Sequence, residues 1–386
     1  MKKINGQSPR KKSRQKSPRV LVAMSGGVDS SVAAQLLKEQ GYKVAGVFLH
    51  FWKDETAGGQ KENRCCSAES LLDARAVAAK LEIPLYTFNF SRQFKKTVVD
   101  DFLGQYDAGR TPNPCVVCNK QIKIGLLLKY ARQLGFDYVA TGHYLNLERV
   151  GREVRLFKAK DRNKDQSYFL YTFTPDELKH LLFPLGPYTK PQVRKLAKKF
   201  SLKVAAKPES QDICFLSGDH NNFLKRYLTL RPGDIRILDS DEKIGEHAGL
   251  PLYTVGQRRG LVGGTGPYYV AKFDYRRNIL YVVKNWNEDI LYESDLVAKK
   301  VNWLSGRAPR RAFSCGAVIR YGHPAVACIV SPLAGKKKTD RKRGRSASGD
   351  AESYQVKFSK PQRAVTPGQS VVFYDRDRVL GGGIIA

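Results

Sequence analysis

Strand and helix signals alternate between residues 19 and 143, and this alternation limits the fold more than any other feature of the sequence. Apolar runs such as RVLVAM at 19–24 and KVAGVFLHF at 43–51 are typical of buried strands. Strands that alternate with helices form parallel sheets with helices on both faces, and such sheets bind ligands at the carboxyl ends of their strands. We therefore expect an α/β domain. The predicted elements are strands at 19–24, 43–51, 84–90 and 136–143 and helices at 28–40, 67–81, 93–106 and 120–134.

The pattern changes near residue 222, where helical periodicity fades. Short alternating runs such as PYYVAKFDY and SVVFYD are separated by Gly, Pro, Asn and Asp turns, which is typical of small β modules and barrels. The basic tract between two strand signals near residue 340 is typical of a long disordered loop. We predict a disordered basic tail at 1–18, a parallel-sheet α/β domain at 19–222, a central, mostly-β domain at 223–294 and a C-terminal β-barrel at 295–386 with a basic insertion at 334–352.

The chain carries 67 Lys and Arg against 36 Asp and Glu, a net charge of +31. Leaving out the two basic tracts at 1–19 and 336–345 still leaves +17. A charge of this size attracts polyanions, and nucleic acid is the first candidate. No apolar run approaches the ~18 residues that cross a bilayer, so no membrane partner is expected.

The cysteine content and the first residues bear on location. Seven cysteines, an odd number in a chain of 386 residues, do not fit a disulfide framework. The basic start lacks the apolar core of a secretory signal. A mitochondrial transit peptide is the alternative, although the stretch has no amphipathic apolar face. We expect a cytoplasmic protein.

A glycine-containing turn, SGGVDS at 25–30, directly follows the first predicted strand. Two glycines allow a tight turn that brings backbone N–H groups close to an anion. Ser30 and Ser31 stand at the start of the next predicted helix, where free amides and the helix dipole favour phosphate. No lysine occupies the position that a Walker A loop requires. A plain turn is the alternative, but this hexapeptide between strand and helix favours a phosphate-binding loop.

The loop resembles the SGGxDS motif of the PP-loop ATP pyrophosphatases. The resemblance implies a domain that binds ATP, with Mg²⁺ assisting, and transfers AMP to a substrate oxygen. A charged Asp29 beside phosphates makes electrostatic sense mainly with a metal ion between them.

Cys115 and Cys118 lie in the segment TPNPCVVCNK, just before the helix predicted to start at Lys120. A thiol at a helix N-terminus beside Lys120 and Lys123 would have a lowered pKa and more thiolate. A C-x-x-C pair can also be half of a zinc site, but the sequence has no second such pair and no H-x₃₋₅-H pair. No metal-ligating residues are therefore assigned.

The remaining cysteines are open to other interpretations. Cys315 and Cys328 fall in the β region, where buried inert thiols are favoured. Cys65 and Cys66 precede a predicted helix and stay unassigned, and a thioredoxin-type pair does not fit the position of the C-x-x-C motif.

Six segments occur in order along the chain: SGGVDS, GRTPNPxxxCN, TGHY, KDQSYFL, SQDICF and AVTPGQSVVFY with a following GGGII. Together they resemble the tRNA-specific 2-thiouridylase family, from about Val20 to Ala386. The resemblance implies ATP-dependent adenylation of the 2-carbonyl of the wobble uridine, position 34 of tRNA, and transfer of a persulfide sulfur to give 2-thiouridine. The implied partners are tRNA and a persulfide-relay protein or cysteine desulfurase as sulfur donor.

The resemblance also implies roles for particular residues. Cys214 would carry the persulfide, and Cys118 would attack the activated carbon or help to release the sulfur; the two could then join as a disulfide. The implied ATP-binding residues are Ala23, Met24, Ser25, Gly26, Gly27, Val28, Asp29, Ser30, Leu49 and Gly142. The implied contacts with the target base and the rest of the tRNA are Asn113, Pro114, Cys115, His143, Lys164, Asp165, Gln166, Arg320, Tyr321 and Gln369.

One position departs from the family pattern. Relatives often carry Asp where this chain has Cys115, with a proposed acid–base role, so that role would pass to Cys115 or to water, or be dispensable. A Cys115–Cys118 disulfide is a competing arrangement. His143, without the resemblance, would be interpreted as a hydrogen-bonded core histidine.

Two other functions remain as alternatives. A PP-loop amide synthetase would need the loop but neither Cys118 nor Cys214. A zinc-stabilised RNA-binding protein without catalysis would bind zinc at Cys115 and Cys118 and be indifferent to ATP.

Overall fold

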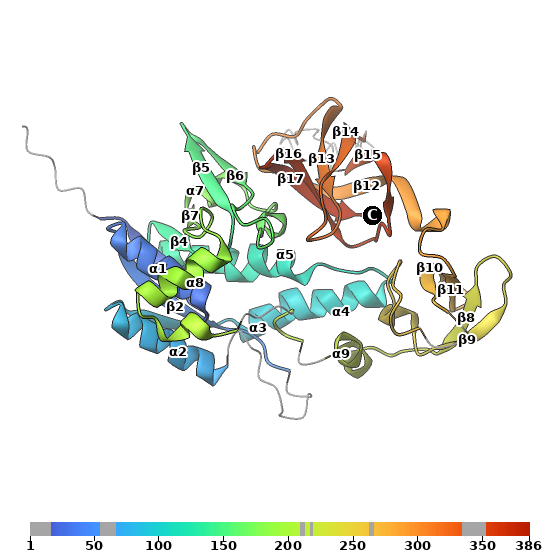
Figure 1. Cartoon of the computed structure of the whole chain (residues 1–386), viewed down its shortest axis with the longest axis horizontal. Helices are drawn as coiled ribbons and strands as arrows, with labels where there is room; N and C mark the ends of the chain where they lie inside the picture. Colours follow the sequence, from blue (N-terminus) through green and yellow to red (C-terminus); the bar gives the residue numbers. More distant parts are fainter. Residues whose placement is uncertain (1–16, 55–66, 209–212, 217–218, 262–265, 334–352) are drawn as a thin grey trace, which may run out of the picture.

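The computed structural model describes residues 17–54, 67–208, 213–216, 219–261, 266–333 and 353–386. The predicted tail, apart from residues 17 and 18, and the predicted insertion lie outside these ranges, as do Cys65 and Cys66. Figure 1 shows an α/β domain, a C-terminal β-barrel and a small central β domain, with helix α4 extending from the first beneath the second toward the third. This arrangement confirms the predicted fold class.

The α/β domain contains a five-stranded sheet with the order β3-β2-β1-β4-β7, in which every pair is parallel. Alternate residues of β1 enter different cores: Val20 and Val22 pack toward one cluster, Leu21 and Ala23 toward the other. Both faces are therefore buried, as the continuous apolar runs predicted. The strands are β1 (Arg19–Ala23), β2 (Lys43–His50), β3 (Leu85–Asn89), β4 (Tyr138–Ala140) and β7 (Leu181–Leu182).

Helices α1 (Val28–Glu39), α2 (Ala68–Lys80) and α8 (Lys190–Lys199) contribute to one of these cores, and the helices between residues 91 and 133 contribute to the other. Two of the latter contain a π turn, a feature often found at functional sites. The segments are α3 (Ser91–Phe94), η2 (Lys95–Val99), α4 (Asp100–Asp107), α5 (Pro114–Cys118), η3 (Asn119–Lys123) and α6 (Gly125–Gln133).

The prediction that a helix starts at residue 120 is wrong by almost two turns, because α5 starts at Pro114. Asn113 accepts a hydrogen bond from the amide of Val116 at 3.4 Å, and Pro114 occupies the first helical position. Both residues favour a helix start here. Cys115 therefore lies in the first turn, whereas Cys118 ends α5 and does not stand at a helix N-terminus.

The central domain has a four-stranded sheet with the order β10-β11-β8-β9, in which only the β11–β8 pair of the described sheet is parallel. Helix α9 (His220–Tyr227) precedes it. The strands are β8 (Gly233–Ile237), β9 (Lys243–His247), β10 (Tyr269–Asp274) and β11 (Ile279–Val283).

Short helices occur in several parts of the chain. They are η4 (Ser167–Phe169), α7 (Pro175–Lys179), η5 (Lys203–Ala206), η6 (Leu250–Leu252) and η7 (Asp289–Leu291).

The C-terminal strands form one sheet with the order β12-β15-β14-β13-β16-β17, and pairing of β12 with β17 closes it into a barrel. A hairpin from the α/β domain, which the sequence did not predict, extends the sheet because Val379 of β17 pairs with Leu156 of β6. The strands are β5 (Asn146–Val150), β6 (Glu153–Phe157), β12 (Tyr292–Trp303), β13 (Phe313–Val318), β14 (Val326–Pro332), β15 (Ser353–Arg363), β16 (Ser370–Asp375) and β17 (Arg378–Ile385).

Cys315 and Cys328 face each other across β13 and β14, with their Sγ atoms 3.7 Å apart. Cys328 is buried and Cys315 is half-buried. The hydrogen bond between the thiols and their burial raise the pKa of Cys315.

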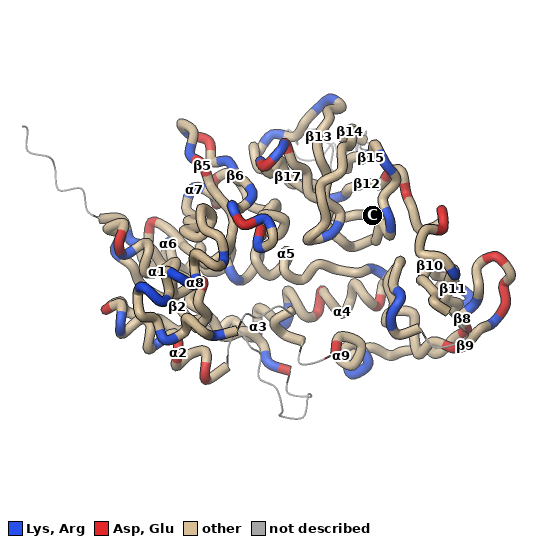
Figure 2. Tube along the Cα trace, viewed as in Figure 1, with Lys and Arg blue, Asp and Glu red and all other residues tan. Residues whose placement is uncertain are grey.

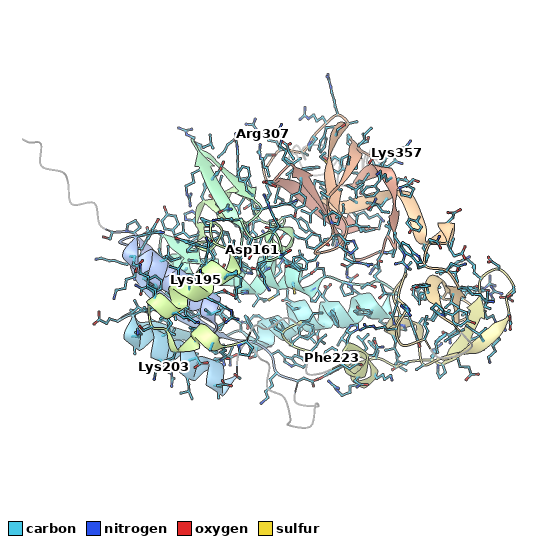
Figure 3. The ribbon with its side chains drawn as sticks, in the orientation of Figure 1. Asp161, Lys195, Lys203, Phe223, Arg307 and Lys357 are labelled. Atoms are coloured by element: carbon cyan, nitrogen blue, oxygen red, sulfur yellow. The ribbon has the colours of Figure 1, made fainter. Side chains whose placement is uncertain are left out.

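Phe223 of α9 provides a test of the packing between this helix and α4 (Figure 3). Its side chain is fully buried and makes edge contacts with Phe102 and Phe215. We expect Phe223→Ala to cost about 3–5 kcal/mol, the usual range for removing a buried ring, measured by urea unfolding. Leu72→Ala, at a side chain that is 62% exposed, is the control and should change stability by less than about 0.5 kcal/mol. Equal effects of the two substitutions would contradict this packing.

Candidate active site

The glycine turn between β1 and α1 is held by its own side chains. Ser30 Oγ accepts a hydrogen bond from the amide of Ser25 at 3.2 Å and donates to the carbonyl of Gly27 at 3.2 Å, and Ser31 Oγ donates to the same carbonyl at 2.8 Å. Gly26 has a φ of +69°, and a Cβ there would collide with the carbonyl oxygen of Ser70. The loop is therefore tight and requires glycine at this position.

The start of α1 fits an anion. Gly27 is the N-cap residue and, as a glycine, has no side chain with which to cap the helix. The first amides of this 12-residue helix, together with its dipole, favour a phosphate group. The fit to the phosphates of ATP rests on this geometry and on the close-packed glycine turn.

The residues implied to bind ATP lie at one edge of the sheet. Ala23 ends β1 and Met24 follows it, Leu49 lies near the end of β2, and Gly142 follows β4. A Cβ on Gly142 would lie 2.8 Å from the amide nitrogen of Ser30, so this glycine allows the close approach of β4's end to α1. The carboxyl ends of three neighbouring strands thus surround the loop.

Asp29 has a cationic partner that sequence reasoning missed. Lys190 Nζ lies 2.8 and 2.7 Å from the two carboxylate oxygens, and the hydroxyl of Tyr144 donates to Oδ1 at 2.7 Å. The Lys190 side chain is only 8% exposed, against 32% for Asp29. Lysine, absent from the loop itself, is thus supplied by the first residue of α8, whose amide also donates to Asp161.

Lys120, one of the two lysines expected to lower the pKa of Cys118, forms an ion pair with a carboxylate. Lys120 Nζ pairs with Glu177 at 2.8 and 2.6 Å and lies 5.2 Å from the centre of the Phe173 ring. Cys118 itself is 9% exposed and belongs to the apolar core. The prediction that Cys118 stands at a helix N-terminus is therefore wrong, whereas an effect of Lys120 and Lys123 on its pKa stays a prediction.

His143 is a buried residue at the junction of two segments. Its side chain is 5% exposed; Nδ1 lies 2.7 Å from Thr141 Oγ1 and Nε2 lies 3.5 Å from Lys123 Nζ. Burial and the charge of Lys123 lower the pKa of His143 well below its usual value. The ring is therefore neutral at pH 7.

Several of the implied tRNA contacts gather around Tyr321. This ring is 42% exposed and packs at 4.5 Å on Phe169, and the charges of Asp165, Lys164 and Cys115 act on it. Arg320 donates to the carbonyl of Ala364 at 3.4 Å. An exposed aromatic ring beside basic side chains suits the stacking of a nucleic-acid base.

Asp165 and Gln166 bond to neighbouring segments. Asp165 accepts hydrogen bonds from the amide of Ala159 at 2.8 Å and the hydroxyl of Ser167 at 2.7 Å, and Gln166 Oε1 accepts from the amide of Tyr144 at 3.0 Å. Burial raises the pKa of Asp165. The bond from Tyr144 to Gln166 ties the KDQ segment, residues 164–166, to a residue that also contacts Asp29.

Cys214 lies in the described segment 213–216 and is half-buried. It packs against the same apolar core that contains Cys118. The next residue, Phe215, contacts Phe94 of α3 and Phe102 of α4, and α5 packs on η2 between them. Both cysteines are thus supported by the helical segment 91–107.

The fold and loop define the class: an α/β nucleotide-binding domain joined to two β domains. A family model described as tRNA methyl transferase HUP domain matches residues 18–218, one described as tRNA methyl transferase PRC-barrel domain matches 221–284, and one described as Aminomethyltransferase beta-barrel domain matches 336–385.

Relatives match almost the whole chain. The chain is 47% identical to the tRNA-specific 2-thiouridylase MnmA of Roseiflexus sp. (strain RS-1), over 95% of this chain and 99% of that protein. It is 45% identical to that of Geobacillus thermodenitrificans (strain NG80-2), over 95% and 94%, and 42% identical to that of Legionella pneumophila (strain Lens), over 95% and 98%. The chain belongs to the tRNA-specific 2-thiouridylase family, which confirms the resemblance seen in the sequence.

The Asp29–Lys190 pair can be tested by a double-mutant cycle. Lys190→Met leaves a partly buried carboxylate without its lysine, and we expect a loss of about 1–3 kcal/mol in unfolding free energy, less than for a fully buried pair. Adding Asp29→Asn should restore part of this stability because the uncompensated charge disappears. Strictly additive effects in urea unfolding would contradict a direct coupling.

His143 predicts a pH dependence of stability. Because its pKa is lower in the folded protein, the unfolded chain binds the extra proton first, so this contribution is complete above about pH 6.5 and is lost as the pH falls below it. His143→Asn should remove a slope approaching about 1.4 kcal/mol per pH unit between about pH 6.5 and 5. Urea unfolding of both proteins across this range measures the difference, and identical slopes would contradict the assignment.

Proposed function

We propose that the protein is a tRNA-uridine 2-sulfurtransferase that adenylates the 2-carbonyl of the wobble uridine with ATP and then replaces the activated oxygen with a persulfide sulfur. The observation that carries the proposal is the position of residues 141–144. Gly142 and Tyr144 contact the first turn of α1, while His143 contacts Lys123, which follows Cys118 by little more than one turn. This segment therefore joins the phosphate loop to the cysteine-bearing helix.

The phosphate loop would bind ATP. The amides of residues 26–30 and the N-terminus of α1 would hold its phosphates, and Lys190 would balance negative charge there. Mg²⁺, when bound, would neutralise phosphate charge; Asp29 is the carboxylate of the loop that would hold it, and would have to give up part of its bonding to Lys190 and Tyr144 to do so. Attack of the uridine 2-carbonyl oxygen on the α-phosphorus would release pyrophosphate and leave AMP on the oxygen as the leaving group.

The two cysteines would then transfer the sulfur. A donor protein leaves a persulfide on Cys214; the Cys118 thiol attacks its inner sulfur, forming a Cys118–Cys214 disulfide and releasing hydrosulfide. Hydrosulfide adds to the activated C2 of uridine, and AMP departs, which leaves 2-thiouridine. A cellular thiol reduces the disulfide, and a reducing cytoplasm would suit this step.

Charge supports tRNA as the substrate. Figure 2 shows Lys and Arg on hairpin β5–β6, on the segment that follows it and on loops of the barrel. Lys164 is close enough to act on Tyr321, and Arg320 acts on Tyr168, whose ring centre lies 6.1 Å from that of Tyr321. A base could therefore stack on the exposed ring of Tyr321 while these cations contact phosphates.

The test is nucleoside mass spectrometry of unmodified tRNA incubated with the protein, ATP, magnesium and a persulfide donor. We expect 2-thiouridine that depends on ATP, at least a 100-fold loss on Cys118→Ser or Cys214→Ser, and little change in tRNA affinity. Cys328→Ser, in the barrel, is the matched control and should retain activity.

Other outcomes would indicate a different role for Cys118 or a different function. A covalent Cys118–tRNA adduct would indicate that Cys118 attacks the activated carbon directly. AMP and pyrophosphate released with ammonia and an organic acid, without thiolation, would indicate an amide synthetase. Stoichiometric zinc, lost on Cys115→Ser, with no response to ATP would indicate a zinc-stabilised RNA-binding protein.

A further inference from the structure

We propose that residues 109–112, here called the strap, position the cysteine-bearing helix α5 through hydrogen bonds to the other two domains, and that Gln369 and Thr254 are the positioning residues. The expected effect on catalysis rests on the proposed function, whereas the positioning of α5 by the strap does not. The strap runs directly into Asn113, the N-cap of α5.

The barrel holds the backbone of the strap. The amide of Thr111 donates to the carbonyl of Pro367 at 2.9 Å, and Gln369 Nε2 donates to the carbonyls of Thr111 and Pro112 at 3.0 and 3.1 Å. A carboxamide nitrogen has two hydrogens, and the strap accepts both. Gln369 was expected from the family resemblance to contact tRNA, whereas its donors here are directed to the protein.

The central domain holds the other side of the strap. Thr254 Oγ1 lies 3.1 Å from Thr111 Oγ1, and the hydroxyl of Tyr275 donates to the carbonyl of Gly109 at 3.1 Å. Gly109 has a φ of +71°, and a Cβ there would collide with the Tyr275 ring. The strap is therefore bonded on both sides within six residues of Cys115.

Close packing makes these contacts specific. Gly368 has a φ of +92°, and a Cβ there would lie 2.9 Å from the carbonyl oxygen of Thr111 and 3.0 Å from Cβ of Arg110. Pro112 and Pro114 restrict the backbone on either side of Asn113. A shift of the strap would therefore pass to α5 instead of being absorbed by a flexible link.

Displacement of a reacting group by about 1 Å can reduce a rate about 100-fold without weakening substrate binding. We therefore expect Gln369→Leu and Thr254→Val to lower kcat for thiolation at least 10-fold. In Thr254→Val, which changes none of the implied tRNA contacts, the Kd for tRNA should stay within twofold. Gln369→Glu, which offers no donor at neutral pH, should match Gln369→Leu. Gln355→Leu is the control, because Gln355 is an exposed barrel residue bonded to Asp295.

Hydrogen exchange of the amides at 115–118 gives a readout that does not require activity. Faster exchange in Gln369→Leu than in Gln355→Leu is expected and supports the strap even if the wild-type protein forms no 2-thiouridine, a result that would overturn only the proposed function. Weaker tRNA binding with unchanged kcat and unchanged exchange would overturn the inference and make Gln369 a direct tRNA contact. Behaviour of Gln369→Leu identical to the control would overturn it as well.

Discussion

The parallel pairing of β1 with β4 determines where the chemistry of this chain can take place. It sets the ends of the two strands side by side, so that Asp29 and Tyr144, 115 residues apart in sequence, are joined by a 2.7 Å hydrogen bond. Lys190 reaches the same carboxylate from α8, which packs against α1. The pairing of β1 with β4 therefore brings Tyr144 to Asp29, and α8 brings Lys190 to the same residue, so the loop at 25–30 has two partners from distant parts of the chain.

A second set of contacts joins this domain to the barrel. Hairpin β5–β6 extends the barrel sheet, the hydroxyl of Tyr168 donates to the carbonyl of Ser370 at 2.8 Å, and Asn302 donates to the carbonyl of Tyr171 at 2.6 Å. The segment that carries the KDQ motif at 164–166 therefore lies between the phosphate loop and the barrel. Because buried polar groups of this kind must stay bonded, the two domains form a single scaffold around Tyr321.

The sequence alone predicts the parts of this arrangement that local patterns control. Buried apolar runs indicate strands, and the SGGVDS turn indicates the phosphate loop, because both depend on neighbouring residues. The start of α5 was also predictable from Asn113 followed by Pro114, a typical N-cap and first-turn pair. Lys190 was not, since it lies 161 residues from Asp29 and nothing local but a helix start marks it. The pairing of β6 with β17 is likewise a long-range contact that no local pattern encodes.

These long-range contacts have a consequence for how the site can work. The α5 helix carries Cys115 and Cys118. The residues before it are bonded to the barrel and the central domain, and η3, which continues it, contacts the segment after β4 through Lys123 and His143. The helix is thus fixed at both ends by elements distant in sequence, and its apolar side packs into the core shared with Cys214. In the mechanism proposed above, a thiol held in this way would need the sulfur to be brought to it by the Cys214 segment and the base by the tRNA. Rigid placement of Cys118 and delivery of both reactants to it would then be two aspects of the same arrangement.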